Sequence, residues 1–190
     1  MEVTDESPYL QQKSYPGGVL KESLLADGAR RLFWELNSAS FLRFLTELSG
    51  IDNLIGDPYL FEAGFHCSGD GAFLDVHADF SHHDLLGLER RLNLILFMNE
   101  EWRATYGGEL GLYGKDLQQV RKIPPLGNRC VIFLTSDDSF HGHPDPMRLP
   151  PGVYRRSVAM YYYSVPTIQR EKASILFPED PSFSHRPTQD

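Results

Sequence analysis

From residue 59 onward the chain consists of short apolar segments separated by Gly, Pro, Asn and Asp, and this pattern constrains the fold more than any other feature. The segments have the length of β-strands and are rich in β-branched and aromatic residues. No helical pattern lies between them, so the crossover helices that a parallel sheet requires are missing. The sequence therefore predicts a mainly β fold of about seven antiparallel strands in a sandwich or barrel. The expected strand segments are YLFEAGFH, GAFLDVHADF, RLNLILFMN, GGELGLYG, VRKIPP, RCVIFLTS and RRSVAMYYYSV.

Two helices are expected before these strands. Apolar residues recur at helical spacing from Lys21 to Asn37, and again after Ser40, which can cap the second helix. Gly50 is well placed to end that helix. Each helix would carry one apolar stripe, so we expect the pair to pack against one face of the sheet.

The length of 190 residues fits a single domain with a core of its own. We expect an N-terminal arm at 1–20, one folded domain at 21–165 and a C-terminal tail at 166–190. Within the domain the helices would occupy 21–50 and the strands 59–165.

The charge balance and the cysteines limit the expected partners and location. A formal net charge of -8 argues against broad electrostatic binding to nucleic acid or to an anionic membrane. The acidic N-terminus differs from a signal peptide, and no apolar run is long enough to span a bilayer. Cys67 and Cys130 are isolated, which predicts free thiols, with Cys130 packed in the apolar run CVIFL. We therefore expect a cytoplasmic protein, and nothing in the sequence predicts its oligomeric state.

Three side chains have the spacing of a metal site. His77 and Asp79 lie two apart in an expected strand, so both point to one face as a two-point metal clamp. Such a pair alone is more often a surface pair. His141, however, follows another expected strand 62 residues after Asp79 (141 minus 79), far enough for intervening strands to return it beside the pair. Two histidines and one carboxylate leave three positions open on iron, as in non-haem Fe(II) oxygenases, whereas structural zinc would need a fourth ligand.

A cosubstrate site is the next expectation. Iron that activates O2 needs two further electrons, and the chain carries no flavin, haem or nicotinamide motif. A 2-oxo acid would supply them by losing CO2, and its remote carboxylate requires a fixed cation. Arg155, fourteen residues after His141 (155 minus 141), offers a planar fork for bidentate pairing, and Ser157 adds a hydroxyl on the same strand face. Arg156 is the competitor, but in its register the bulky neighbours Val158 and Met160 would crowd the ligand.

The remaining histidines and a basic pair have simpler interpretations. His143 is the alternative to His141, although it stands in a turn-like segment before proline. His82 and His83 are interpreted as solvated loop residues, and His66 as a residue that can line the pocket. The basic pair Arg90-Arg91 is interpreted as a solvated or ion-paired surface feature.

Six segments occur in the order and spacing of a known family: GDGAFLDVHADF, RRLNLILFMNEEW, GGELGLYG, IPPLGNRCVIF, SFHGHP and RRSVAMYYY. From about Phe41 to Tyr163 the chain resembles the Fe(II)/2-oxoglutarate-dependent dioxygenases, in particular the branch similar to prolyl 4-hydroxylases. The resemblance implies a double-stranded β-helix, or jelly roll, with the helices packed on one sheet. It implies Fe(II), O2 and the cosubstrate 2-oxoglutarate, which is decarboxylated to succinate, with ascorbate as an optional reductant.

The resemblance also assigns roles to residues. His77, Asp79 and His141 match the iron ligands, and Arg155 matches the residue that pairs with the C5 carboxylate of 2-oxoglutarate. Asn93 lies on a neighbouring strand, where the family often places a polar group near the cosubstrate.

Two contacts of the family are expected to be missing. Phe97 and Cys67 fall where some prolyl hydroxylases carry tyrosines that touch 2-oxoglutarate, so those hydroxyls are absent. A carboxylate at Asp79 favours hydroxylation over halogenation, because halogenating relatives have a small residue there. The expected reaction is hydroxylation of an unactivated C-H bond, on a prolyl or other residue of a peptide or protein. The alternatives are a small-molecule hydroxylase, a non-oxidative metal enzyme of the cupin type, and a catalytically silent binding module.

Overall fold

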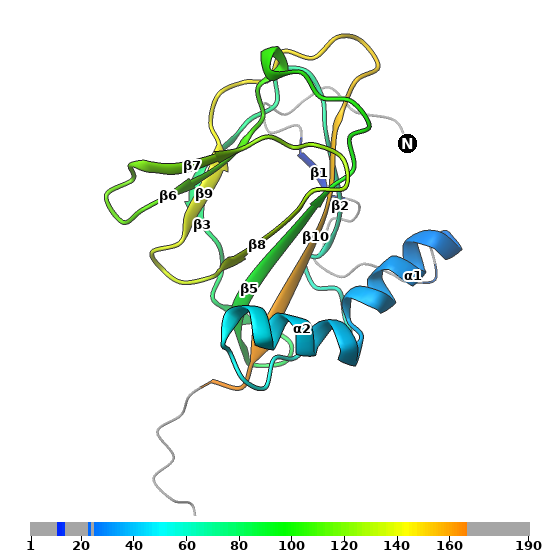
Figure 1. Ribbon diagram of the computed structural model, residues 1–190, viewed down its shortest axis with the longest axis vertical. Helices are drawn as coiled ribbons and strands as arrows, with labels where there is room; N and C mark the ends of the chain where they lie inside the picture. The colour runs from blue at the N-terminus through cyan, green and yellow to red at the C-terminus, as the bar shows by residue number, and fades with distance from the viewer. Residues whose placement is uncertain (1–10, 14–22, 24, 167–190) are drawn as a thin grey trace, which may run out of the picture.

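The computed structural model describes residues 11–13, 23 and 25–166. Within them, two helices and ten strands build two antiparallel sheets that face each other (Figure 1). The larger sheet has the order β1-β2-β10-β5-β4, with β8 also paired to β5, and the smaller sheet has the order β3-β9-β6-β7. The predicted mainly β fold with N-terminal helices is confirmed. The strands are β1 (Gln11–Lys13), β2 (Gly64–Ser68), β3 (Leu74–Ala78), β4 (His82–His83), β5 (Leu88–Phe97), β6 (Leu110–Tyr113), β7 (Gln119–Ile123), β8 (Cys130–Leu134), β9 (Phe140–His143) and β10 (Arg155–Ser164).

The second helix, α2 (Ala39–Ser49), is capped two residues earlier than predicted. Ser38 has an extended backbone, and its hydroxyl accepts a hydrogen bond from the Phe41 N-H at 3.2 Å. Ser40 therefore lies inside the first turn. Gly50 ends the helix with a left-handed φ of 71°, as its position in the sequence indicated.

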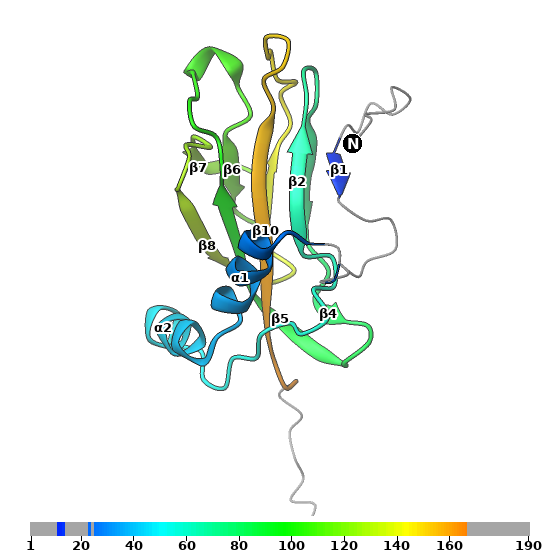
Figure 2. The ribbon, with the colours of Figure 1, turned by 90° about the vertical axis from the view of Figure 1, so that its right-hand side faces the viewer.

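Both helices cover the outer face of the larger sheet, away from the smaller sheet (Figures 1 and 2). Helix α1 (Asp27–Leu36) begins later than the predicted start at Lys21, which lies outside the described residues. Alternate side chains of β5 and β10 point to the helices, while those between them face the smaller sheet. This alternation separates the apolar core under the helices from the cavity that holds the polar side chains. The buried core members are Phe33, Leu36, Leu45, Leu54, Leu60, Leu92, Leu94, Val158, Met160 and Tyr162.

Two predicted strands differ from the observed ones. The segment 59–66 was expected to be extended, but Leu60 and Glu62 have left-handed φ angles of 49° and 57°, so β2 begins only at Gly64. His141 was expected at the end of the strand that contains VIFL. It lies instead on a separate short strand, β9, in the smaller sheet.

Only small parts of the predicted arm and tail are among the described residues, and both cysteines are. Of the predicted arm, Gln11–Lys13 forms the edge strand β1, and the rest lies outside the described residues, as does nearly all of the predicted tail. Cys67 and Cys130 are free thiols, but Cys130 is exposed rather than packed, because it starts the edge strand β8. In the described part of the chain, no helix has the length and apolar character needed to cross a membrane.

Candidate metal centre

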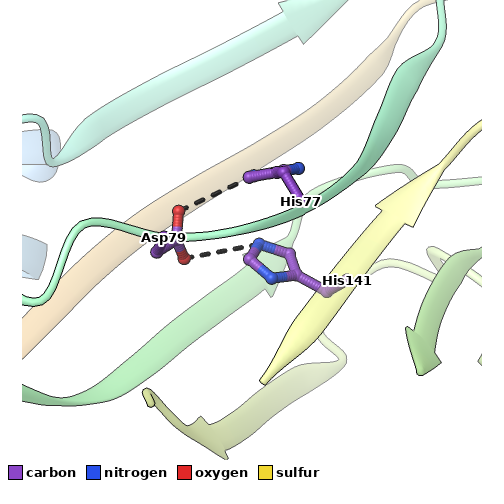
Figure 3. Close-up of side chains that lie close together, drawn as sticks. All are labelled: His77, Asp79 and His141. Atoms are coloured by element: carbon purple, nitrogen blue, oxygen red, sulfur yellow. Dashed lines mark ion pairs between the residues drawn. The ribbon is translucent and has the colours of Figure 1, made fainter. Parts of the chain in front are cut away.

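The three candidate ligands come from two neighbouring strands of the smaller sheet. His77 lies on β3, Asp79 follows that strand, and His141 lies on β9 directly opposite His77 in the antiparallel register. The three side chains point toward one another (Figure 3), and their ligand atoms all lie within 4.8 Å of one another. The structure therefore brings together the group that the spacing predicted.

The donor set fits a divalent iron ion. The Nε2 atom of His77 lies 3.7 Å from Oδ1 of Asp79, and Nε2 of His141 lies 3.4 Å from Oδ2. Nδ1 of His77 lies 2.8 Å from the carbonyl oxygen of Asp75. Because a carbonyl only accepts, this nitrogen carries the proton and Nε2 keeps its lone pair for a metal. Two imidazoles and one carboxylate match the facial set of Fe(II) oxygenases.

Burial and charge tune the protonation of these groups. Burial lowers the pKa of His141 to about 4, so this imidazole is neutral and able to bind a cation near pH 7. Burial alone would raise the pKa of Asp79, but the neighbouring His77 imidazole and the charge of Arg90 hold it well below its usual range. The neighbouring Asp79 carboxylate raises the pKa of His77. The carboxylate is thus ionised and available as a ligand.

Arg90 belongs to this site: it is ion-paired, as one of the two interpretations held, but it is buried rather than at the surface. Its guanidinium is buried, with Nη2 donating to Oδ2 of Asp79 at 3.0 Å. It lies between two rings, 3.5 Å from the centroid of Tyr161 and 4.3 Å from that of Phe80. Only Arg91 is the half-exposed member of the pair.

A β-bulge explains why strand alternation did not reveal Arg90. In the pairing of β5 with β10, Leu92 lies opposite Tyr162, but Arg90 lies opposite Tyr163, so Arg91 is the extra residue. Strict alternation would have placed Arg90 with Leu92 on the helix-covered face. The bulge turns its side chain to the cavity instead.

Asn93 supports the candidate metal ligand directly. Its amide nitrogen donates to Oδ2 of Asp79. Its amide oxygen accepts from Nε of Arg90 at 2.8 Å and from the Thr135 hydroxyl at 3.1 Å. The Asn93 side chain lines the cavity, and these contacts join it to the metal end.

Arg155 lies at the other end of the same cavity and is buried, 5% exposed. Its Nε donates to the carbonyl oxygen of Gly108 at 2.8 Å, and its guanidinium lies 5.0 Å from the ring centroid of Phe97. No carboxylate pairs with it among the residues that the structure describes. Burial lowers its pKa to about 10, so it remains a cation at neutral pH.

The strand register decides between the two arginines of β10. Arg155 faces the cavity together with Ser157, Ala159 and Tyr161, whereas Arg156 is exposed. Val158 and Met160, the residues expected to crowd the alternative register, pack against the helices instead.

The other histidines only partly take the places that the sequence indicated. His83 is completely buried, with Nε2 3.3 Å from Oδ1 of Asp57, so its interpretation as a solvated residue was wrong. The two-residue strand β4, too short to recognise, holds it against β5. His82 is exposed, as expected. His66 and His143 both line the cavity.

Cys67 does not face the cavity. In the register of β2 with β10 it lies opposite the exposed Arg156, while His66 lies opposite Ser157. Residues opposite each other in a ladder share one face, so Cys67 points away from the proposed cosubstrate side. Its expected position beside the cosubstrate was therefore wrong by one residue, and His66 takes that place.

Comparison with known families agrees with this geometry. A family model, the 2OG-Fe(II) oxygenase superfamily, matches residues 63–163, which is 101 of the 190 residues (163 minus 62). The chain belongs to this superfamily. It is a 2-oxoglutarate-dependent dioxygenase that uses Fe(II), 2-oxoglutarate and O2. Membership of this superfamily supports a hydroxylating enzyme.

Solved structures of prolyl hydroxylases are similar in fold. The prolyl-4-hydroxylase of Pseudomonas putida matches with a TM-score of 0.52 and 20% identity, over 74% of this chain and 67% of that one. A Trichoplax adhaerens prolyl hydroxylase, in complex with a hypoxia inducible factor peptide fragment, gives 0.50 and 17%, over 73% and 58%. The viral collagen prolyl hydroxylase of Paramecium bursaria Chlorella virus-1, a complex with 2-oxoglutarate, gives 0.50 and 15%, over 86% and 99%. These likenesses establish the jelly-roll fold.

Proposed function

We propose that the protein hydroxylates an unactivated C-H bond in a peptide or protein, coupled to decarboxylation of 2-oxoglutarate to succinate. In this proposal His77, Asp79 and His141 bind the iron. Arg155, with Ser157 beside it, binds the remote carboxylate of 2-oxoglutarate. The observation that carries the proposal is the buried guanidinium of Arg155, in one cavity with the His-Asp-His group.

A buried cation needs a partner, and the cosubstrate supplies one. An ionised group removed from water is destabilising unless it is paired and hydrogen-bonded. Because Nε of Arg155 is already bound to the Gly108 carbonyl, the remaining N-H groups are left for a carboxylate. A dicarboxylate that met the bound iron at one end and Arg155 at the other would therefore be fixed at both ends.

When bound, Fe(II) with 2-oxoglutarate and O2 supplies the oxidant that removes hydrogen from an unactivated C-H bond. The chain's residues hold the geometry for this chemistry. The Asp75 carbonyl orients the His77 ring, and Arg90 with Asn93 holds one oxygen of Asp79. Arg155 orients the cosubstrate from the opposite end of the cavity.

A peptide or protein substrate is favoured over a free metabolite. The Trichoplax adhaerens neighbour is bound to a peptide fragment, and it shares this fold. The rim beside Asp79 carries the partly exposed ring of Phe80 in contact with the rings of Phe61 and Tyr161, at centroid distances of 6.0 Å each. Such an aromatic rim suits an apolar side chain held on an extended backbone. The cytoplasmic location expected from the sequence and the single-domain division remain predictions.

The experiment is an anaerobic titration of the Fe(II)-loaded protein with 2-oxoglutarate, followed by exposure to air. We expect a weak visible charge-transfer band during the titration and succinate after air is admitted. A screen of peptides and amino acids for products heavier by one oxygen atom then identifies the substrate class. Arg155→Met is the test variant, because it removes the cation. Arg156→Met, which removes its exposed neighbour, is the matched control. Absence of both the band and succinate in the wild-type protein would refute the proposal.

A further inference from the structure

We infer that His143 binds the remote carboxylate of the cosubstrate together with Arg155. The sequence indicated this histidine only as an alternative iron ligand to His141, and the resemblance assigned it no role. The inference rests on the proposed function, because it requires 2-oxoglutarate to lie in the cavity with its C5 carboxylate on Arg155.

Its position on β9 places His143 toward the Arg155 end. His141 and His143 are two residues apart on one strand, so their side chains share a face. Two residues of an extended strand span roughly 6.6 Å, which is about the separation between the two ends of a five-carbon dicarboxylate. With His141 at the iron, His143 is one cosubstrate length along the cavity wall.

Contacts around Gly108 place the same histidine near the guanidinium. His143 and Gly108 line a small recess together with Pro144. The carbonyl of Gly108 accepts the Nε hydrogen bond of Arg155. His143 also lines the main cavity with Arg155 and Ser157, so the three side chains bound the same end of it.

The imidazole of His143 has unused hydrogen-bonding capacity. The residue is 5% exposed, and its Nδ1 atom is buried with no hydrogen-bond partner among the described residues. A buried polar atom without a partner is unfavourable, and native structures satisfy such atoms with protein, water or ligand. A carboxylate on Arg155 would supply an acceptor for an imidazole N-H.

Metal binding is not the better assignment for His143. The atoms that gather within 4.8 Å of one another belong to His77, Asp79 and His141, and His143 is not among them. The two assignments predict different effects of removing His143. If His143 bound the metal, its removal would lower the affinity for the metal. If it contacts the remote carboxylate, its removal would lower only the affinity for acids that carry a remote carboxylate.

The test compares His143→Leu with His143→Asn, whose amide nitrogen can replace Nδ1 as a donor. Dissociation constants are measured anaerobically by calorimetry with Co(II)-loaded protein, for 2-oxoglutarate and for 2-oxobutyrate, which lacks the remote carboxylate. We expect His143→Leu to raise the constant for 2-oxoglutarate at least about tenfold, since hydrogen bonds to charged groups are the stronger class. The constants for 2-oxobutyrate and for Co(II) should stay within about twofold, and His143→Asn should recover most of the loss. His82→Leu is the matched control at an exposed histidine.

Equal weakening of both oxo acids, weaker Co(II) binding, or unchanged 2-oxoglutarate binding in His143→Leu would overturn the inference. His143→Phe is a second variant that lacks the donor and keeps a planar ring, so the comparison does not depend on one folded variant. Failure of the proposed function has a different signature. In that case the wild-type protein itself binds 2-oxoglutarate no better than 2-oxobutyrate, and Arg155→Met changes nothing.

Discussion

Replacing Gly108 with alanine tests whether the backbone around Arg155 is built to hold that side chain. Gly108 has a left-handed φ of 69°, and a β-carbon there would lie 2.5 Å from Sδ of Met147 and 3.3 Å from Cδ of Arg155. Met147 is buried, 1% exposed, and packs against Ala72 and Leu149, so it has little room to yield. The new methyl group is therefore expected to displace the Arg155 side chain.

The expected magnitude follows from two separate effects. The left-handed backbone costs any residue with a β-carbon roughly 1–2 kcal/mol of folding stability. Displacing Arg155 removes a charge-assisted contact with the cosubstrate, worth about 1.5–3 kcal/mol, which corresponds to roughly a 10- to 150-fold rise in the dissociation constant for 2-oxoglutarate.

Gly107→Ala is the matched control for this change. Gly107 has nearly the same φ, 73°, but a β-carbon there meets only the Cα atom of Met147, at 4.0 Å. Both variants should lose the stability that the left-handed backbone costs, and Gly108→Ala should lose more in thermal unfolding because only its β-carbon clashes with Met147. Only Gly108→Ala should lose affinity in calorimetry of the Co(II)-loaded protein with 2-oxoglutarate. If both variants bind 2-oxoglutarate equally well, or lose affinity equally, the proposed support of Arg155 by Gly108 is wrong.

Three further changes test other parts of the structure. Arg90→Met should destabilise the metal-free protein by about 3 kcal/mol in urea unfolding, because it leaves the carboxylate of Asp79 without its buried cation. Arg91→Met, at the half-exposed neighbour, should change stability by about 0.5 kcal/mol or less in the same assay. Ser38→Ala should cost about 1 kcal/mol through loss of the α2 cap, whereas Ser40→Ala should be nearly neutral; the reverse order in thermal unfolding would contradict the assigned cap. Co(II) at about one hundred times its dissociation constant should stabilise the wild-type protein by about 2.7 kcal/mol and Asp79→Ala far less, and equal stabilisation of both would place the metal elsewhere.

Most of the correct predictions about the site came from the two-residue periodicity of strands. On β10 the small residues Ser157 and Ala159 alternate with the bulky Val158 and Met160, so the sequence itself shows which face can hold a ligand. The same alternation predicts His77 and Asp79 on one face. Local alternation is a short-range property, and a regular strand preserves it.

The features around the site that sequence reasoning missed depend on long-range pairing. Arg90 reaches the cavity through a bulge opposite Tyr163, and no residue pattern within β5 records that extra residue. His83 is buried because Asp57, distant in sequence, and a two-residue strand enclose it. His141 sits on a strand of only four residues that is stabilised by pairing with β3 and β6 rather than by its own propensity.

The most direct test of the central claim is a crystal structure of the protein with 2-oxoglutarate and with Mn(II) in place of Fe(II), from crystals grown anaerobically. The account predicts one metal ion bound by Nε2 of His77, a carboxylate oxygen of Asp79 and an imidazole nitrogen of His141, with the C5 carboxylate of 2-oxoglutarate paired to Arg155. A metal ion bound elsewhere, or a cosubstrate whose remote carboxylate lies away from Arg155, would contradict it.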